Sequence, residues 1–215
     1  MVIKKLTLSL LLIAALLIVG SLLIRKEGIS RIPKESNQNE QTTNEVTLPK
    51  GLVQPLDRAA ERITKKRYGT KVSPTSSPVN PERFTGIHTG TDFEIFPDEE
   101  NKDIPVYAIC DGPVRYFQTA RGYGGLLTQD CNIDGQAVLV AYGHIKLSSV
   151  TAKTGDKLTA GTQFALLGNG FSPETDKERK HLHLGIHKGT SNDTRGYVAT
   201  TAELAEWLNW EEIIK

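Results

Sequence analysis

The segment His181-Leu-His-Leu-Gly-Ile186 combines a strand pattern with two histidines that can converge on one metal ion. In a β-strand the side chains alternate between faces, so residues two apart point the same way, about 6.6 Å apart along the chain. His181 and His183 are therefore expected to present both imidazoles on one surface. The 215-residue chain has five histidines, and all of them lie between His88 and His187.

Two motifs further upstream supply more groups that can bind a metal. His88-Thr-Gly-Thr-Asp92 holds a histidine and a carboxylate, and Tyr142-Gly-His144 holds another histidine. Gly90 and its flanking threonines predict a loop that enters a strand at Asp92–Phe96. Zinc accepts imidazole nitrogen and carboxylate oxygen, and a catalytic site needs three protein ligands with a fourth position left for water. His88, Asp92 and one histidine of the downstream pair would meet that requirement.

The sequence has no His-Glu-x-x-His segment, which excludes the common helical metalloprotease arrangement. Its motifs instead resemble those of the lysostaphin-type zinc metalloendopeptidases, which cut the peptides of bacterial peptidoglycan. The resemblance covers roughly residues 68 to 190 and follows the order of motifs in that family. Its segments are Tyr68-Gly-Thr-Lys, His88-x-Gly-x-Asp92, Ala108-Ile-Cys-Asp-Gly-Pro-Val114, Gly122-Tyr-Gly124, Tyr142-Gly-His144-Ile, Gly155, Gly161 and His181-Leu-His183.

The resemblance implies a fold, a cofactor and roles for five residues. The implied fold is mainly β, an antiparallel sandwich or open barrel called the duplicated hybrid motif, with the metal in a groove on one sheet. Carried over by position, His88, Asp92 and His183 are the zinc ligands, and His144 and His181 are catalytic. One of these two histidines would accept the proton of the attacking water, and the other would stabilise the oxyanion or protonate the leaving amine. The sequence leaves that assignment open.

Two features lie outside the resemblance. The segment Asn169–Lys180 is longer and more charged than the usual short turn before the last motif, so we expect it to border the substrate groove and to alter specificity. His187 has the same strand parity as His183 but lies four residues beyond it, about 13 Å along a strand. We therefore expect a structural role for His187.

The apolar run Leu6–Ile24 is flanked by Lys4-Lys5 and Arg25-Lys26. Its 19 residues would span about 28 Å as a helix, close to the hydrocarbon thickness of a membrane and longer than an ordinary signal-peptide core. We expect residues 1–26 to be a transmembrane signal anchor, with cleavage after Ser21 and secretion as the alternative. Residues 27–50 are polar and are predicted to form a flexible linker.

Residues 51–215 are predicted to form the zinc metallopeptidase domain. We place it outside the plasma membrane, at the bacterial cell envelope, because the inferred peptidoglycan substrate is there. A literal positive-inside count opposes this orientation, since four cationic residues follow the apolar run within about ten residues and only two precede it. That rule is weak when a long domain follows.

Short strands separated by Gly and Asp predict a mainly β domain from Pro105 onward. Two helices are expected at the ends of the domain, the first with four apolar residues, Leu56, Ala59, Ala60 and Ile63, on one face. The predicted helices are 56–66 and 202–214, and the predicted strands are 106–109, 114–117, 137–142, 164–167 and 182–186.

Cys110 and Cys131 are the only cysteines, and they lie in or beside neighbouring strand segments. An extracytoplasmic domain permits oxidation, so we expect a disulfide, with two separate thiols as the alternative. No Cys-x-x-Cys spacing exists that would favour a cysteine zinc site.

The predicted function is that of a membrane-anchored zinc endopeptidase acting on cell-wall peptides. A catalytically silent member of the same fold, which binds peptidoglycan or activates another hydrolase, is the first alternative. A phosphocarrier domain with two active histidines is the second, and Asp92 and the apolar N-terminal run argue against it. The formal net charge is +1 without a long basic run, so nucleic acid is not an expected partner. The oligomeric state, the bond that is cut and any regulation stay open.

Overall fold

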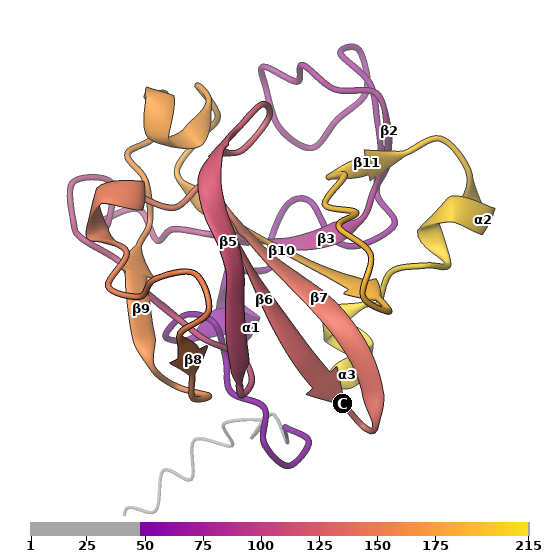
Figure 1. Ribbon diagram of the computed structural model, residues 1–215. Helices are drawn as coiled ribbons and strands as arrows, with labels where there is room; N and C mark the ends of the chain where they lie inside the picture. Colours follow the sequence, from indigo (N-terminus) through magenta and orange to yellow (C-terminus); the bar gives the residue numbers. More distant parts are fainter. Residues whose placement is uncertain (1–47, 215) are drawn as a thin grey trace, which may run out of the picture. The chain divides into compact units, whose positions relative to one another are not determined.

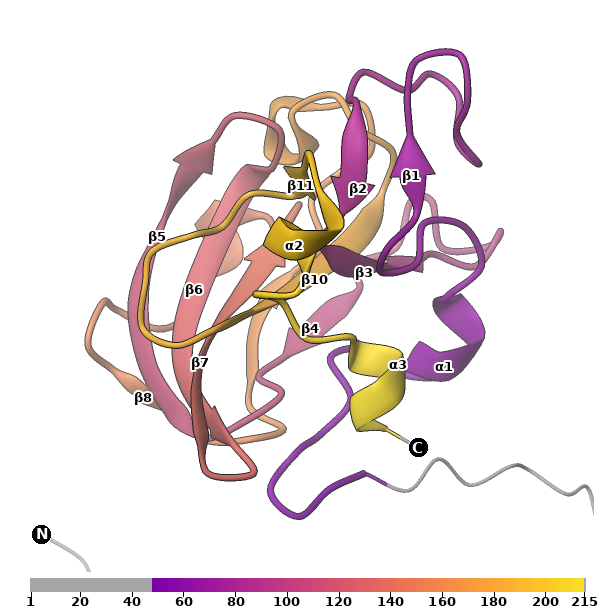
Figure 2. The same cartoon turned by 90° about the vertical axis from the view of Figure 1, so that its right-hand side faces the viewer.

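A computed structural model describes residues 48–214 and shows antiparallel sheets with few, short helices (Figures 1 and 2). This confirms the predicted mainly β class. The largest sheet has six strands in the order β3 (Gly90–Glu94), β10 (His181–Lys188), β7 (Gln136–Gly143), β6 (Gly124–Ile133), β5 (Gly112–Ala120) and β8 (Lys157–Leu158). The smaller sheets contain β1 (Lys71–Val72), β2 (Gly86–His88) and β11 (Tyr197–Val198), and β4 (Pro105–Tyr107) with β9 (Gln163–Leu166).

Strand β10 brings the three motifs of the sequence together because it pairs with a different strand on each side. On one side it pairs with β3, where His183 is opposite Asp92. On the other side it pairs with β7, where His183 is opposite Gly143, the residue before His144. The register of these two pairings therefore places the His-x-His motif between the other two motifs.

The two faces of β10 carry different side chains, apolar on one and histidine on the other, as the alternation in its sequence predicts. Leu182, Leu184 and Ile186 point into the main hydrophobic core, where each is at most 1% exposed. His181 and His183 have the opposite parity and lie on the other face. Burying a side chain of this size contributes roughly 1.5–3 kcal/mol, so the core face holds the strand in register.

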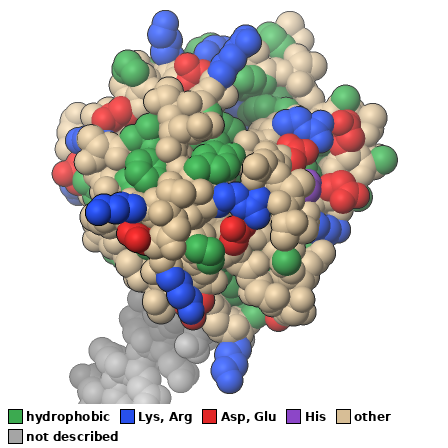
Figure 3. Space-filling view, viewed as in Figure 1, with side chains coloured by type: hydrophobic (Ala, Val, Ile, Leu, Met, Phe, Trp, Pro, Cys, Tyr) green, Lys and Arg blue, Asp and Glu red, His purple; other side chains and the backbone are tan. Residues whose placement is uncertain are grey.

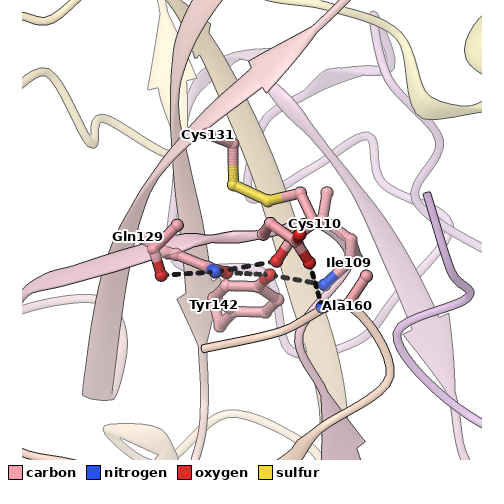
Figure 4. The surroundings of a disulfide bond; sticks show 8 residues. Ile109, Cys110, Gln129, Cys131, Tyr142 and Ala160 are labelled. Carbon is pink, nitrogen blue, oxygen red and sulfur yellow. Dashed lines mark hydrogen bonds between the residues drawn. A yellow bond between two sulfur atoms is a disulfide. The ribbon is translucent and has the colours of Figure 1, made fainter. Parts of the chain in front are cut away.

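One central strand, β6, was not among the predicted strands. Its Thr128 and Gln129 are fully buried yet polar, which conceals the alternation of a half-buried strand. The Gln129 amide donates to the carbonyl oxygens of Cys110 and Gly112, and its oxygen accepts from the Tyr142 hydroxyl (Figure 4). These bonds satisfy the buried amide, so a polar residue is tolerated in the sheet.

The entry to the site also differs in detail from the prediction. The structure has a strand before Asp92 as well, because His88 ends β2 and Gly90 begins β3, with Thr89 between them. His88 and Asp92 therefore both lie on strands rather than in a loop.

The predicted helix 56–66 is reduced to α1 (Ala59–Arg62). Leu56, Ala59 and Ile63 are buried as predicted, but Ala60 is exposed. Arg58 has a φ of 54°, in the left-handed region, so the helix does not extend back to Leu56.

The predicted helix 202–214 is replaced by two short helices, α2 (Thr201–Leu204) and α3 (Trp210–Ile213). The backbone between them bonds to the end of β10 instead: Lys188 N–H donates to Glu206 O, and Leu208 N–H donates to Ile186 O, both at 2.8 Å. This pairing with a distant strand replaces the local helical bonds. Two short 3₁₀ helices, Leu147–Ser149 and Pro173–Thr175, complete the elements.

Within residues 48–214, no helix is long and apolar enough to span a bilayer. The predicted anchor at residues 1–26 and most of the predicted linker lie outside the described residues and stay predictions.

The structure joins Cys110 and Cys131 in a disulfide, with Cα atoms 6.1 Å apart, and so confirms the predicted pairing (Figure 4). Cys110 lies just before β5 and Cys131 lies in β6. The bond therefore links the start of the β5–β6 hairpin to the strand that the sequence did not reveal.

Replacing both cysteines with serine is expected to lower the free energy of unfolding by about 3 kcal/mol, because the bond closes a loop of 21 residues in the unfolded chain. Denaturant unfolding of the wild type and of the double variant measures the difference. Counting thiols in the denatured, unreduced wild type is the control, and two free thiols would contradict the bond.

Candidate metal centre

Three side-chain atoms from β2, β3 and β10 converge in the interior of the domain. His88 Nε2 lies 3.0 Å from His183 Nδ1 and 3.2 Å from Asp92 Oδ1, and His183 Nδ1 lies 3.1 Å from Asp92 Oδ1. All three residues are at most 3% exposed. Tetrahedral zinc with bonds of about 2.0–2.1 Å requires ligand atoms about 3.3 Å apart, so this triangle has the size that zinc needs.

The other nitrogen of each histidine shows that the converging atoms are lone pairs. His88 Nδ1 lies 3.2 Å from the Arg67 carbonyl oxygen, which can only accept a hydrogen bond. His183 Nε2 lies 3.4 Å from the Tyr123 hydroxyl, whose own proton is donated to Thr194 O at 2.7 Å. Each histidine therefore carries its proton on the outer nitrogen and turns a lone pair toward Asp92. Two nitrogen lone pairs and a carboxylate oxygen make a donor set for a cation.

Two motif glycines are required by close packing around these three side chains. A Cβ atom at Gly90 would lie 2.6 Å from the Leu184 carbonyl oxygen and 2.7 Å from the His183 ring. A Cβ atom at Gly143 would lie 2.3 Å from the Tyr123 ring. Glycine at both positions lets the His183 imidazole and its partner Tyr123 occupy this space.

The charge of Asp92 is stabilised by its neighbours. Burial alone would raise the pKa of this carboxyl, but its charged neighbours, among them the Arg179 guanidinium, hold the pKa well below its usual range. Arg179 Nη2 donates to Asp92 Oδ2 at 2.7 Å. The carboxylate is thus ionised and available to a cation at neutral pH.

The two remaining motif histidines lie next to each other beside the triangle. The ring centroids of His144 and His181 are 4.2 Å apart. His181 Nδ1 lies 2.8 Å from Arg179 O, which assigns its proton to Nδ1, and its Nε2 lies 3.3 Å from Asp92 Oδ2. His144 has a φ of 63°, an uncommon value for a residue other than glycine. Burial, then the nearby His181, lowers the pKa of His144 well below its ordinary value.

These groups line a pocket of about 260 Å³ together with aromatic side chains. Its lining has four polar residues that could take part in chemistry and three aromatic rings. The polar residues are Asp92, His144, His181 and His183, and the rings are Phe84, Tyr123 and Tyr197. Phe84 and Tyr197 stack with ring centroids 5.0 Å apart. Glu178, from the charged segment before β10, also lines the pocket, which places that segment at the border of the groove.

His187 lies apart from this cluster, as its distance along the strand predicts. Its ring packs edge-on against Trp207 with centroids 4.9 Å apart, and its Nδ1 lies 3.2 Å from the Ser191 hydroxyl.

On the face of the domain seen in Figure 3, Lys and Arg side chains are interspersed with Asp and Glu side chains.

Sequence reasoning missed two residues that contact the predicted ligands. Tyr123 was quoted only as part of Gly122-Tyr-Gly124, and Arg179 only as one charge in a charged segment. Arg179 had a usable signal, because it lies two residues before His181 and so has the same strand parity. Tyr123 had none, since its contact depends on the packing of the β5–β6 turn against β10.

The metal-free protein is expected to lose stability in acid. Burial lowers the pKa of His183 to about 4, whereas a histidine in an unfolded chain has a pKa of about 6.5. Between these values the unfolded chain binds more protons, so stability falls as the pH falls. From pH 7 to 4.5, His183 should contribute a loss of about 2 kcal/mol. Denaturant unfolding in the presence of a chelator measures it.

The His183→Gln variant is the control for this measurement, because it removes the titrating group and leaves the carboxylates. Its free energy of unfolding should change less between the two pH values than that of the wild type. Equal pH dependence in both proteins would contradict the role given to His183 burial.

Two histidines and a carboxylate that converge beside two more histidines make a donor set of the kind that can hold zinc with one position left open. The sequence profile of Peptidase family M23 matches residues 86–195, which is half of the chain. The chain therefore belongs to Peptidase family M23. The matched range contains His88, Asp92, His144, His181 and His183.

Several solved structures are similar to this chain. The catalytic domain of the antimicrobial peptidase lysostaphin from Staphylococcus simulans is 21% identical, with 69% of this chain and 88% of that chain covered and a TM-score of 0.47. LytU is 23% identical, with 71% and 90% covered and a TM-score of 0.46. The protein cbpa from L. salivarius REN is 18% identical, with 76% and 94% covered and a TM-score of 0.49. None of the curated proteins compared with this chain matches it.

Proposed function

We propose that this chain is a zinc-dependent endopeptidase that hydrolyses peptide bonds in the stem peptides or cross-bridges of bacterial peptidoglycan. The observation that carries the proposal is the convergence of His88 Nε2, Asp92 Oδ1 and His183 Nδ1 within 3.2 Å, beside two further histidines in one pocket. Membership of Peptidase family M23 supports the peptidase activity. A silent scaffold would have no need of the complete set.

The roles of the five residues follow from their contacts. His88, Asp92 and His183 would hold zinc, which when bound supplies Lewis acidity for hydrolysis of a peptide bond. His181 Nε2 is the atom that receives a proton from the attacking water, because its Nδ1 already donates to Arg179 O. The Asp92 carboxylate, 3.3 Å away, stabilises the imidazolium that forms.

His144 has a complementary role. Its lowered pKa keeps the ring neutral at neutral pH, so it can donate an N–H hydrogen bond to the developing oxyanion. The leaving amine would take the proton that His181 Nε2 has received from the water. Tyr123 and Arg67 orient the two histidine ligands from outside the triangle. The stacked rings of Phe84 and Tyr197 give the pocket an apolar wall against which a substrate could pack.

We place the domain outside the plasma membrane, held by the predicted anchor at residues 1–26. The disulfide between Cys110 and Cys131 supports this placement, because such bonds persist in oxidising compartments. Peptidoglycan lies in the same compartment.

The test is digestion of purified peptidoglycan by the zinc-loaded, full-length chain, using walls with glycine bridges and walls with direct cross-links. New amino groups should appear in at least one wall type, and mass analysis of the products identifies the bond. A chelator should stop the release. A folded, zinc-loaded chain that binds walls but cleaves none of them would favour the silent scaffold. A chain without zinc would contradict the proposal.

A further inference from the structure

The two oxygens of the Asp92 carboxylate have different partners. Oδ1 faces the two histidine nitrogens at 3.1 and 3.2 Å, whereas Oδ2 accepts a hydrogen bond from Arg179 Nη2 at 2.7 Å. Only Oδ1 is therefore turned toward the candidate zinc position. The Arg179 side chain is 13% exposed, so this contact is largely shielded from water.

Arg179 also contacts a second carboxylate, Glu94, which lies on the same strand as Asp92. Its Nε lies 3.0 and 2.9 Å from the two oxygens of Glu94, and its Nη2 lies 2.5 Å from Glu94 Oε1. Glu94 follows Asp92 by two residues in β3, so both carboxylates lie on one face. The planar guanidinium spans the two carboxylates, which a single ammonium group cannot do with the same geometry.

The backbone that carries Arg179 is fixed as well. The next residue, Lys180, is 4% exposed, and its Nζ donates to the carbonyl oxygens of Glu99, Glu100 and Lys102 at 3.2, 3.0 and 2.6 Å. The strand that follows begins with His181 opposite Glu94. Arg179 therefore lies two residues before the first paired residue of β10, next to a fixed Lys180.

From this arrangement we infer that Arg179 is a positioning residue that holds Asp92 in a one-oxygen geometry for the metal, with Glu94 as its anchor. This inference rests on the proposed zinc site. Buried ion pairs contribute little net stability, so a fold alone does not require the Arg179–Glu94 pair. Residues that orient a ligand from outside commonly change metal affinity by about 10- to 100-fold when they are replaced.

A charge effect and an orientation effect predict opposite results, which makes the inference testable. Arg179→Gln removes one positive charge near the site, so charge alone would make zinc bind more tightly. Loss of orientation would make zinc bind more weakly. The double variant Arg179→Gln/Glu94→Gln leaves the net charge unchanged, so charge alone predicts no effect and loss of orientation predicts weaker binding.

The experiment measures the zinc dissociation constant of the full-length chain by competition with a chelator, without using activity. We expect Arg179→Gln and the double variant each to raise the constant by about 10- to 100-fold. Lys65→Gln is the matched control: Lys65 Nζ lies 3.4 Å from Glu94 Oε2 and is exposed, so this variant removes the same charge without freeing Asp92. Its dissociation constant should stay within about threefold of the wild type.

Thermal unfolding of each variant checks the fold. If Arg179→Gln does not fold, Arg179→Lys replaces it. Lysine keeps the positive charge but lacks the planar guanidinium that spans both carboxylates, so Arg179→Lys should still weaken zinc binding. Unchanged or tighter binding in a folded Arg179 variant would overturn the inference while leaving the zinc site intact. A wild type that binds no zinc would overturn both the inference and the proposed function.

Discussion

Asp92→Ala and His183→Ala are each expected to reduce the zinc content of the purified chain from about one equivalent to near zero. Either change removes one corner of the triangle formed by His88 Nε2, Asp92 Oδ1 and His183 Nδ1. An open catalytic site has three protein ligands, so only two would remain. Asp92→Ala also leaves the buried Arg179 with one carboxylate partner fewer, which adds a cost to folding.

Elemental analysis after dialysis measures this outcome, and His187→Ala is the matched control. His187 lies on the same strand with the same parity as His183, but it packs against Trp207 instead of facing Asp92. The control variant should keep its full equivalent of zinc. One equivalent of zinc in both Asp92→Ala and His183→Ala would contradict the ligand assignment.

The same measurement separates the proposed enzyme from a phosphocarrier domain. A phosphocarrier uses its histidines for phosphoryl transfer and needs no zinc, so its metal content would not depend on Asp92. The geometry favours the metal site, because His88 and His183 turn lone pairs toward each other across 3.0 Å. Two unprotonated nitrogens at that distance repel each other unless a cation or a proton lies between them.

The strands that carry the site could be predicted because their pattern is local. The alternation of Leu182, Leu184 and Ile186 with the histidines is visible within seven residues, and β10 runs where it was expected. Strand β6 could not be predicted in the same way, since its buried Gln129 is satisfied by partners elsewhere in the sequence. The prediction of one C-terminal helix over residues 202–214 was wrong for a related reason. The backbone around Trp207 pairs with the end of β10, about twenty residues away in the sequence.

The candidate site likewise has features that local sequence predicts and features that depend on long-range packing. The residue types, their order and the shared face of His181 and His183 follow from short motifs. Which atoms converge depends on the register of β3 and β7 against β10, and that register is set by packing over long sequence separations. The contact of Arg179 with Asp92 joins residues 87 positions apart, so a single sequence cannot show it.

His144→Ala and His181→Ala are each expected to keep zinc and the fold while lowering the rate of peptidoglycan cleavage by about 10²- to 10⁴-fold. Neither residue belongs to the ligand triangle, yet both line the pocket, with ring centroids 4.2 Å apart. The size of the loss reflects the general acid–base assistance that a positioned imidazole supplies.

Three measurements on the same preparations decide whether these histidines serve catalysis: zinc content, release of amino groups from walls, and wall binding. In an enzyme, the two variants retain zinc and wall binding but lose cleavage, while His187→Ala cleaves like the wild type. In a silent scaffold, the wild type itself releases no amino groups, and the variants bind walls as it does. Loss of zinc in His144→Ala or His181→Ala would instead make that histidine a ligand. Because His181 Nε2 lies 3.3 Å from Asp92 Oδ2 and His144 makes no contact with the triangle of that kind, His181 is the variant in which this distinction is sharpest.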